Sequence, residues 1–242
     1  MIPPIKGFIK NTLLDWDGRV ASVIFLPGCN FRCPICHSPH LVVAHDESDS
    51  IPLESVLEYL VSNREWVDGL VITGGEPTLQ PGIIELLELL RAREIPVKMD
   101  TNGSRPDVLG EILQRGLVES VAMDIKTTPE KYDIVAGVHV DVALIGRSIR
   151  LLMDRAAEYC FRTTVCPAFH TGDDVEEMAR WIKGAKRYIL QNFRPKKCLE
   201  PDMEKVQSFK VEELHRFATR AEKHVASCIV CGYEPVRLVS SI

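Results

Sequence analysis

The sequence predicts an α/β fold, and among α/β folds an open, partial (β/α)6 barrel. Runs of apolar and β-branched residues alternate along the chain with segments whose apolar residues recur at helical spacing. Such alternation is typical of a parallel sheet whose strands are joined by right-handed crossovers. Six strand–helix units are too few for a closed eight-stranded barrel, so we expect the barrel to stay open. A doubly wound open sheet is the alternative that the pattern also allows.

The expected strands are short apolar runs, and the expected helices are the longer segments between them. The strands are predicted at residues 20–26, 69–73, 95–100, 118–125, 159–165 and 187–190. The helices are predicted at residues 52–63, 81–93, 106–115, 141–157, 173–183 and 211–224. The second helix begins with Pro81 and ends near Arg91 and Arg93, as helix termini prefer. Asp173 and Asp174 stand where the fifth helix should begin, which suits its N-terminal dipole.

The length and composition predict one domain with a sizeable core. The chain has 242 residues, of which 45% are hydrophobic and 26% are charged, as is ordinary for a globular protein. We expect a single domain over residues 1–242. Within it we expect an N-terminal extension at 1–19, a barrel core at 20–225 and a C-terminal strand and tail at 226–242.

The charge and the hydropathy pattern bear on location and partners. A formal net charge of −5 gives no reason to expect a nucleic-acid partner. No apolar run is long enough to cross a membrane. The first 18 residues carry two prolines, Asp15 and Asp17, which is unlike a signal peptide. We therefore expect a cytoplasmic protein with no membrane partner, in which the eight cysteines are metal ligands or buried thiols rather than disulfides.

Polar or glycine-rich clusters follow the expected strands, each at the point where a strand ends. Four of them read PGCNFRCPICH, TGGEP, DTNGS and DIKTT, and the fifth expected strand carries Arg162. In parallel α/β folds the C-terminal ends of the strands meet on one face, where active sites are built. We therefore expect these motifs to surround one cavity.

The first cluster contains three cysteines, Cys29, Cys33 and Cys36. Their thiolates would repel one another unless a cation or a metal cluster neutralised them. The surrounding proline, glycine and asparagine residues predict a loop, which disfavours three buried core cysteines. A [4Fe–4S] cluster would use all three thiolates and leave one iron open to a ligand.

Two other metal sites are alternatives for the same motif. A zinc site could be completed by His37, but Cys36 and His37 are adjacent, and neighbours rarely bind one ion. The CPICH sequence also matches a c-type haem attachment, which would leave Cys29 without a role. We therefore favour the iron–sulfur cluster.

The C-x3-C-x2-C spacing, followed by TGGEP after the second expected strand, resembles the radical S-adenosylmethionine (SAM) superfamily. The resemblance implies that the three cysteines bind a [4Fe–4S] cluster whose open iron is chelated by SAM. It further implies that one electron from the cluster cleaves SAM to methionine and a 5′-deoxyadenosyl radical. The fold expected from the resemblance is the partial (β/α)6 barrel of the radical SAM type.

The same resemblance implies several contacts with SAM. Gly74, Gly75 and Glu76 would contact its amino group, largely through backbone carbonyls. Ile35 stands where the family usually has an aromatic residue, and its backbone would contact the adenine. Without a ring, Ile35 offers no side-chain stacking.

The DTNG and DIK segments resemble those of the glycyl radical enzyme activases. The resemblance implies that Asp124 and Lys126 bind the carboxylate and ribose of SAM and that Arg162 pairs with the carboxylate. It also implies that Asp100 and Asp124, with Thr101, hold a monovalent cation near that carboxylate. The structural alternative is an ordinary ion pair between Asp124, Lys126 and their neighbours.

Motifs along nearly the whole chain together resemble the activating proteins of anaerobic ribonucleoside-triphosphate reductase. They are GFIKNTLLDWDGRVASVIFLPGCNFRCPICHSP, VITGGEPTLQP, VKMDTNGS, VAMDIK and AKRYILQNFRP. The resemblance implies an oxidoreductase that generates a glycyl radical on a partner enzyme, with a flavodoxin or ferredoxin as electron donor. One alternative is a small-molecule radical SAM enzyme resembling 7-carboxy-7-deazaguanine synthase. A second alternative, of another class, is a metal-binding accessory protein without turnover, which the open iron disfavours.

Cysteines and basic residues late in the chain allow two further hypotheses. Cys166, Cys198, Cys228 and Cys231 could hold an auxiliary cluster. Residues 225–231 resemble a strand, however, on which Cys228 and Cys231 would face opposite sides, so we favour buried thiols. The basic stretch from Lys183 to Lys197 could dock an acidic electron donor, although such a stretch is more often a solvated face.

Overall fold

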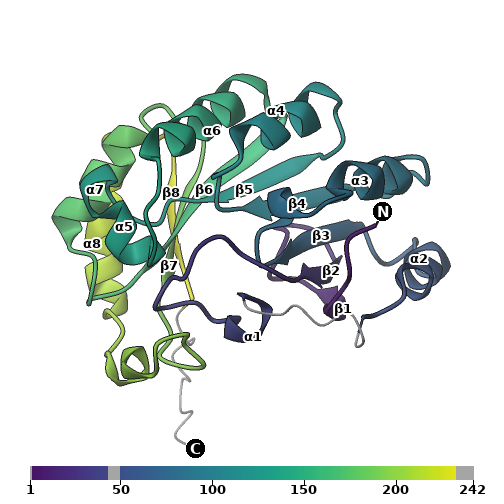
Figure 1. Cartoon of the computed structure of the whole chain (residues 1–242). Helices are drawn as coiled ribbons and strands as arrows, with labels where there is room; N and C mark the ends of the chain where they lie inside the picture. The colour runs from purple at the N-terminus through teal and green to yellow at the C-terminus, as the bar shows by residue number, and fades with distance from the viewer. Residues whose placement is uncertain (1, 43–49, 233–242) are drawn as a thin grey trace, which may run out of the picture.

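The computed structural model describes residues 2–42 and 50–232, and within them the strands form one curved sheet (Figure 1). The strands are β1 (Gly7–Thr12), β2 (Ala21–Leu26), β3 (Gly69–Gly74), β4 (Val97–Thr101), β5 (Ser120–Asp124), β6 (Glu158–Val165), β7 (Tyr188–Asn192) and β8 (Cys228–Cys231). Their order in the sheet is their order in the chain. β1 runs antiparallel to β2, and every later pair of neighbours is parallel. β1 and β8 remain as the two edges, so the barrel stays open.

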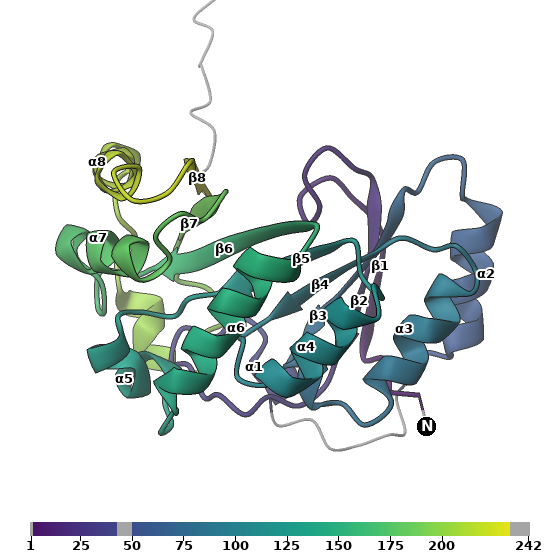
Figure 2. The ribbon, with the colours of Figure 1, turned by 90° about the horizontal axis from the view of Figure 1, so that it is seen from above.

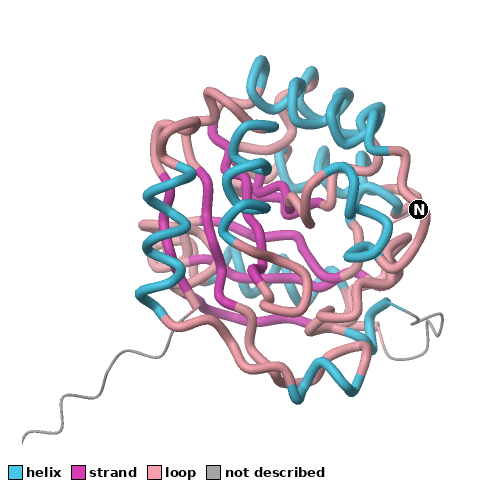
Figure 3. Tube along the Cα trace, turned by 90° about the vertical axis from the view of Figure 1, so that its left-hand side faces the viewer, coloured by secondary structure: helices cyan, strands magenta, loops and turns pink. Residues whose placement is uncertain are grey.

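The connections between the parallel strands contain the helices. The α-helices are α1 (Pro39–Val42), α2 (Leu53–Ser62), α3 (Ile83–Arg91), α4 (Pro106–Gln114), α5 (Tyr132–Ala136), α6 (Val142–Arg155), α7 (Gly172–Trp181) and α8 (Val211–Ala221). Short 3-10 helices lie at Pro77–Leu79, Pro129–Lys131 and Pro201–Lys205. The longer helices follow one another along the outer side of the sheet, as Figures 2 and 3 show from two directions. In the described ranges, no helix is long and apolar enough to span a lipid bilayer.

The predicted fold class is confirmed. The six expected strands are β2 to β7, and the six expected helices are α2, α3, α4, α6, α7 and α8. The strand expected after residue 225 is β8, while the tail beyond residue 232 lies outside the described residues. The short helices α1 and α5 were not expected, because four or five residues are too few for a periodic apolar pattern.

The N-terminal extension expected at 1–19 contains strand β1, which the sequence pattern did not predict. Three consecutive residues of β1 are exposed, among them Ile9 at 43%. Its pairing with β2 also shifts register between Ile9 and Thr12. An edge strand with this exposure lacks the apolar–polar alternation by which a strand is recognised. The extension is therefore part of the sheet.

Helix α3 illustrates how the sequence builds the outer layer. Ile83, Leu86, Leu87 and Leu90 recur at spacings of one, three and four residues, and all four side chains are buried. Burying each such side chain stabilises the folded state by about 1.5–3 kcal/mol relative to leaving it in water. The sheet beneath is apolar on both faces over much of β2, β3 and β5, as expected for covered parallel strands.

A loop formed by residues 13–20, the floor loop, closes the N-terminal end of the sheet's inner side. Its Trp16 is 1% exposed and packs against Ala21 and Val23 of β2 and Val71 of β3. The Arg19 guanidinium lies 4.3 Å from the centre of the Trp16 ring. The floor loop thus leaves the opposite end, where the parallel strands terminate, as the open side of the barrel.

Candidate functional site

A cavity of about 250 Å³ lies at the C-terminal ends of the parallel strands. Its walls are the loop after β2 and the ends of β3 to β7. It is lined by all twelve residues expected to bind the cluster or SAM: Cys29, Cys33, Ile35, Cys36, Gly74, Gly75, Glu76, Asp100, Thr101, Asp124, Lys126 and Arg162. The volume is slightly below the roughly 300–1,000 Å³ of small-molecule sites in proteins. The structure thus brings the predicted motifs together, while their ligand roles stay predictions.

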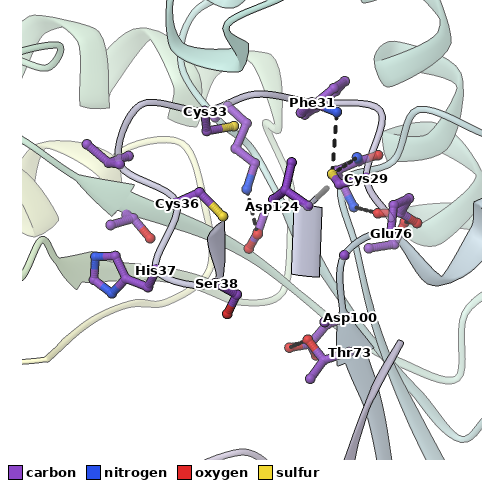
Figure 4. A pocket seen from close by; sticks show the side chains of 18 of the residues that line it. Cys29, Phe31, Cys33, Cys36, His37, Ser38, Thr73, Glu76, Asp100 and Asp124 are labelled. Carbon is purple, nitrogen blue, oxygen red and sulfur yellow. Dashed lines mark hydrogen bonds and ion pairs between the residues drawn. The ribbon is translucent and has the colours of Figure 1, made fainter. Parts of the chain in front are cut away.

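Residues 27–38, the cysteine loop, form one wall of the cavity. In Figure 4 the sulfur atoms of Cys33 and Cys36 point into the cavity, and Cys29 lies on the opposite side of the same space. A tight turn orients the second and third cysteines, with the Cys36 N–H donating to the Cys33 carbonyl at 2.9 Å. The Phe31 N–H donates to the Cys29 sulfur at 3.4 Å. The thiols of a single loop are therefore directed toward one region.

Two other segments hold the cysteine loop in place. The Arg32 N–H donates to the Ala136 carbonyl at the end of α5, at 2.8 Å. Gly137 follows with a φ of 68°, and a Cβ there would lie 2.1 Å from the Arg32 carbonyl oxygen, so only glycine fits. On the other side, the Leu199 N–H donates to the Cys36 carbonyl at 3.1 Å. The loop is thereby fixed between α5 and the segment after β7.

Burial dominates the electrostatics of the thiols. It raises the pKa of Cys33 to about 11, although the nearby Lys126 ammonium acts in the opposite direction. Burial also raises the pKa of Cys29, against the hydrogen bond from Phe31. Each thiolate would disfavour the others, since the charges of Cys29 and Cys36 add to the pKa of Cys33. The protein alone therefore favours the neutral thiols of Cys29 and Cys33, and their thiolates need an added positive centre such as iron.

His37 does not complete a zinc site with the cysteines. Figure 4 shows its ring directed away from the three sulfur atoms. The ring packs against Phe193 with centroids 5.8 Å apart, and burial followed by the charge of Arg194 lowers its pKa. In the described part of the chain, no three His, Cys, Asp or Glu side chains are grouped to hold a single metal ion. The geometry gives no support to the zinc alternative.

The glycines of the TGGEP motif let the end of β3 pack directly against the cysteine loop. Gly74 has a φ of 121°, in the region that favours glycine. A Cβ on Gly75 would lie 1.9 Å from the Gly28 carbonyl oxygen. That oxygen accepts a hydrogen bond from the Glu76 N–H at 2.8 Å. The two motifs are thus interlocked through their backbones.

The Glu76 carboxylate accepts hydrogen bonds from other groups of the protein. Its Oε1 accepts from the Thr78 N–H at 3.1 Å and from the Thr101 hydroxyl at 2.7 Å, and its Oε2 accepts from the Asn102 N–H at 2.6 Å. The residue is 1% exposed, and burial raises its pKa although these hydrogen bonds act against that. The carboxylate therefore ties the end of β3 to the end of β4. Only the backbone of this segment is left for a ligand, which agrees with the role expected from the resemblance.

Charged side chains from β4, β6, the end of β5 and the segment directly after β5 form a network at the centre of the cavity. The Arg162 Nε lies 2.7 Å from one oxygen of Asp124, and its Nη1 lies 3.2 Å from Asp100. The Lys126 ammonium lies 2.8 Å from the other oxygen of Asp124. Burial disfavours the charged form of Asp124, but Arg162 and then Lys126 outweigh it and hold its pKa well below the usual range. The ion pair expected as the structural alternative, between Asp124, Lys126 and Arg162, is present and lies in the wall of the cavity.

Lys98 belongs to the same network, although sequence analysis did not select it. Its ammonium lies 3.2 Å from Oδ1 of Asp100 and donates to the Asp15 carbonyl of the floor loop. Lys98 and Asp100 are two residues apart on β4, so their side chains lie on the same face of the sheet. That spacing is the signal that could have identified Lys98. Thr164 and Gln191, which are paired across β6 and β7, also line the cavity and were not predicted.

The four late cysteines do not gather in one place. Cys228 is 8% exposed, and burial followed by the charge of Glu222 raises its pKa to about 12. Burial also raises the pKa of Cys231, three residues later on β8, although the charge of Arg162 acts in the opposite direction. Cys166 and Cys198 pack in another place, with Ile35 and Phe193. Cys166 and Cys198 thus lie apart from Cys228 and Cys231, which gives no support to an auxiliary cluster held by all four.

The basic stretch from Lys183 to Lys197 divides between the two ends of β7. At the N-terminal end, Arg187 pairs with Asp17 of the floor loop at 2.7 Å. At the C-terminal end, Arg194, Lys196 and Lys197 are exposed beside the cysteine loop. Only the second group lies near the cavity.

Comparisons with known proteins agree with the site. A family model described as the radical SAM superfamily matches residues 23–182. The chain therefore belongs to the radical SAM superfamily, which makes it an enzyme and implies a [4Fe–4S] cluster and SAM as cofactors.

One relative extends over nearly the entire chain. It is MJ1227 of Methanocaldococcus jannaschii, named provisionally as a glycyl-radical enzyme activating enzyme. The identity is 29% over 233 residues, which cover 93% of this chain and 95% of the relative.

Solved structures show the same fold. A domain of a pyruvate-formate lyase-activating enzyme from Bacteroides vulgatus has a TM-score of 0.54 at 17% identity, covering 68% of this chain and 99% of that one. SuiB of Streptococcus suis, bound to its precursor peptide SuiA, has a TM-score of 0.65 at 15% identity, covering 87% of this chain and 48% of that one. At such identities the similarity concerns the fold alone.

Proposed function

We propose that the protein is a glycyl radical enzyme activase, which uses SAM and a [4Fe–4S] cluster to generate a glycyl radical on a partner enzyme. The observation that carries this proposal is the cavity in which the cysteine loop faces the cationic network of β5 and β6. The similarity to the M. jannaschii relative over nearly its full length supports the activase type, because that protein is named for this activity.

Cys29, Cys33 and Cys36 are proposed to hold the cluster. The donor set fits, because three thiols face one space, and burial makes the ionised forms of Cys29 and Cys33 depend on a positive centre. Three thiolates for four irons leave one iron open to SAM. When bound, the cluster supplies the electron that cleaves SAM. The Phe31 N–H stabilises the ionised form of Cys29, and the interlock with Gly75 holds the loop against the end of β3.

The remaining walls are proposed to bind SAM. Arg162 and Lys126 present positive charge to a carboxylate, and Arg162 is held in place by both Asp100 and Asp124. The backbone of Gly74, Gly75 and Glu76 faces the amino group, while the carboxylate of Glu76 keeps that backbone in position. Ile35 lies in an apolar cluster with Phe193, which offers an apolar surface beside the adenine. Thr101 completes this wall through its hydrogen bond to Glu76.

The proposed protein partners are a glycyl radical enzyme, for which we expect anaerobic ribonucleoside-triphosphate reductase, and a flavodoxin or ferredoxin. Arg194, Lys196 and Lys197 form a basic surface beside the cysteine loop, which suits an acidic electron carrier. A cytoplasmic location is part of the same proposal. No exchangeable monovalent cation is included, because the carboxylates of Asp100 and Asp124 already contact cationic side chains.

The decisive experiment mixes the anaerobically reconstituted protein with SAM, a reductant and the candidate reductase. The expected result is 5′-deoxyadenosine together with the electron paramagnetic resonance doublet of a glycyl radical. A Cys33→Ala variant should lose both signals, whereas Cys228→Ala should retain them. SAM cleavage without a doublet would favour the small-molecule alternative, and a fully loaded cluster without SAM cleavage would favour the accessory protein.

A further inference from the structure

Lys98 is a buried cation below the cavity whose role the proposed function leaves unexplained. Its side chain is 10% exposed, and its ammonium has two partners, Oδ1 of Asp100 and the carbonyl of Asp15. A buried ammonium is costly unless it is paired, so this arrangement requires both partners. Lys98 does not line the cavity, whereas Asp100 does. The contact that links Lys98 to the cavity is therefore its ion pair with Asp100.

The charges of the network show what Lys98 changes. Three cations, Lys98, Lys126 and Arg162, surround two carboxylates, Asp100 and Asp124. The network thus carries one surplus positive charge. Without Lys98 the charges would cancel, and Asp100 would have Arg162 as its sole cationic partner among the contacts described here. The pull of Asp100 on Arg162 would then compete with any carboxylate in the cavity.

We propose that Lys98 is a resident counter-cation for Asp100, which takes the place of an exchangeable monovalent cation and leaves Arg162 free to receive the carboxylate of SAM. The inference rests on the proposed function, because it assigns that carboxylate to Arg162. Each carboxylate oxygen of the network lies within 3.2 Å of a lysine or arginine nitrogen. At Oδ1 of Asp100, which accepts no hydrogen bond in the described part of the chain, the Lys98 ammonium supplies the positive charge. The Thr101 hydroxyl is also engaged, since it donates to Glu76 and accepts from the Gly103 N–H at 3.1 Å.

The position of Lys98 also explains why a protein-borne cation is feasible here. The floor loop brings the Asp15 carbonyl to the ammonium, and the next residue, Trp16, is buried against β2 and β3 and holds this loop in place. An ammonium held by one carbonyl and one carboxylate has the kind of oxygen contacts that a monovalent cation would otherwise take. Lys98 is thus a positioning residue, acting on Arg162 through Asp100.

The test measures SAM binding by calorimetry on the anaerobically reconstituted, unreduced protein. Binding is compared in choline chloride, sodium chloride and potassium chloride at equal ionic strength. For the unchanged protein we expect dissociation constants that agree within about twofold, because no alkali ion is required. Binding that needs sodium or potassium would overturn the proposal and leave the proposed function intact. Absence of SAM binding in every buffer, with the cluster fully loaded, would overturn both.

Variants separate this role from a purely structural one. Lys98→Met should weaken SAM binding at least about tenfold in choline chloride, and potassium or sodium should restore a large part of the loss. Lys98→Arg should bind without alkali ions, because it retains the charge. Lys223→Met removes an exposed lysine beyond the end of α8 and should behave like the unchanged protein.

Two variant results would contradict the proposal. One is a folded Lys98→Met protein that binds SAM normally in choline chloride. The other is a loss of binding that no alkali ion reverses. If Lys98→Met does not fold, the cation dependence of the unchanged protein decides the question on its own.

Discussion

Replacing Gly75 by alanine should separate the end of β3 from the cysteine loop. The added Cβ would lie 1.9 Å from the Gly28 carbonyl oxygen, whereas real contacts of this kind start near 3.0 Å, so the backbones must move apart by about 1 Å. The displacement disrupts the hydrogen bond from the Glu76 N–H to the Gly28 carbonyl and strains the one from the Gly75 N–H to Leu26. Two such bonds amount to about 1–3 kcal/mol of unfolding free energy.

The loss should appear both in stability and in cofactor binding. Urea unfolding of the reduced, metal-free protein should show the decrease in unfolding free energy. Reconstitution should give less iron per chain and weaker SAM binding, because the cysteine loop and the glycine backbone shift relative to each other. Gly110→Ala is the matched control, since its Cβ in α4 would meet nothing closer than 3.7 Å and alanine favours a helix by about 0.5–1 kcal/mol. A Gly75→Ala protein with unchanged unfolding free energy and a full iron content would refute the reasoning.

Three further changes test other parts of the site. In Glu76→Gln the new amide N–H₂ faces a backbone N–H or a hydroxyl donor, so the free energy of unfolding in urea should fall by about 2–4 kcal/mol. The control Glu58→Gln, at an exposed position, should lower it by less than about 0.5 kcal/mol. Equal decreases in the two variants would contradict the structure. Asp124→Asn should cost roughly 2–4 kcal/mol at pH 7, because Arg162 and Lys126 lose their partner. Because the pKa of Asp124 is depressed in the folded state, its carboxylate stabilises the fold fully above about pH 4 and less below that pH. The difference in unfolding free energy between the variant and the unchanged protein should therefore be equal at pH 7 and pH 5 and shrink toward pH 3. A difference that already falls between pH 7 and pH 5 would argue against this ion pair. Cys228→Ala should leave the iron content of reconstituted protein unchanged, whereas fewer irons would revive an auxiliary cluster.

Much of the fold follows from the sequence because the parallel strands are buried and therefore strongly apolar. The runs at 20–26 and 118–125, for example, became β2 and β5, whose side chains are buried on both faces. Strand β1 escaped prediction because it is an edge strand with exposed residues, and nothing in its local pattern distinguishes it from a loop. The short helix α5 depends on Tyr132 packing in the core, which is a tertiary effect.

The site was predictable to the extent that each motif marks the end of a strand. The rule that such ends share one face placed the cysteines, the glycines, Asp124 and Arg162 around one cavity. The sequence could not show what each side chain contacts. The TGGEP motif does not distinguish a Glu76 carboxylate that binds a ligand from one that connects the ends of β3 and β4, which is the arrangement in the structure. Lys98 was passed over because its partner Asp15 comes from a distant loop.

The serial order of the strands has a consequence for how the protein is synthesised. Each parallel strand pairs with the one that leaves the ribosome next, so the sheet can extend one unit at a time without a long wait for a distant partner. The cavity is different, because its walls run from Cys29 after β2 to Gln191 in β7. A nascent chain therefore exposes three reactive thiols well before the residues that enclose them exist. We therefore expect a cluster to be enclosed by this cavity only after the last strands have been added.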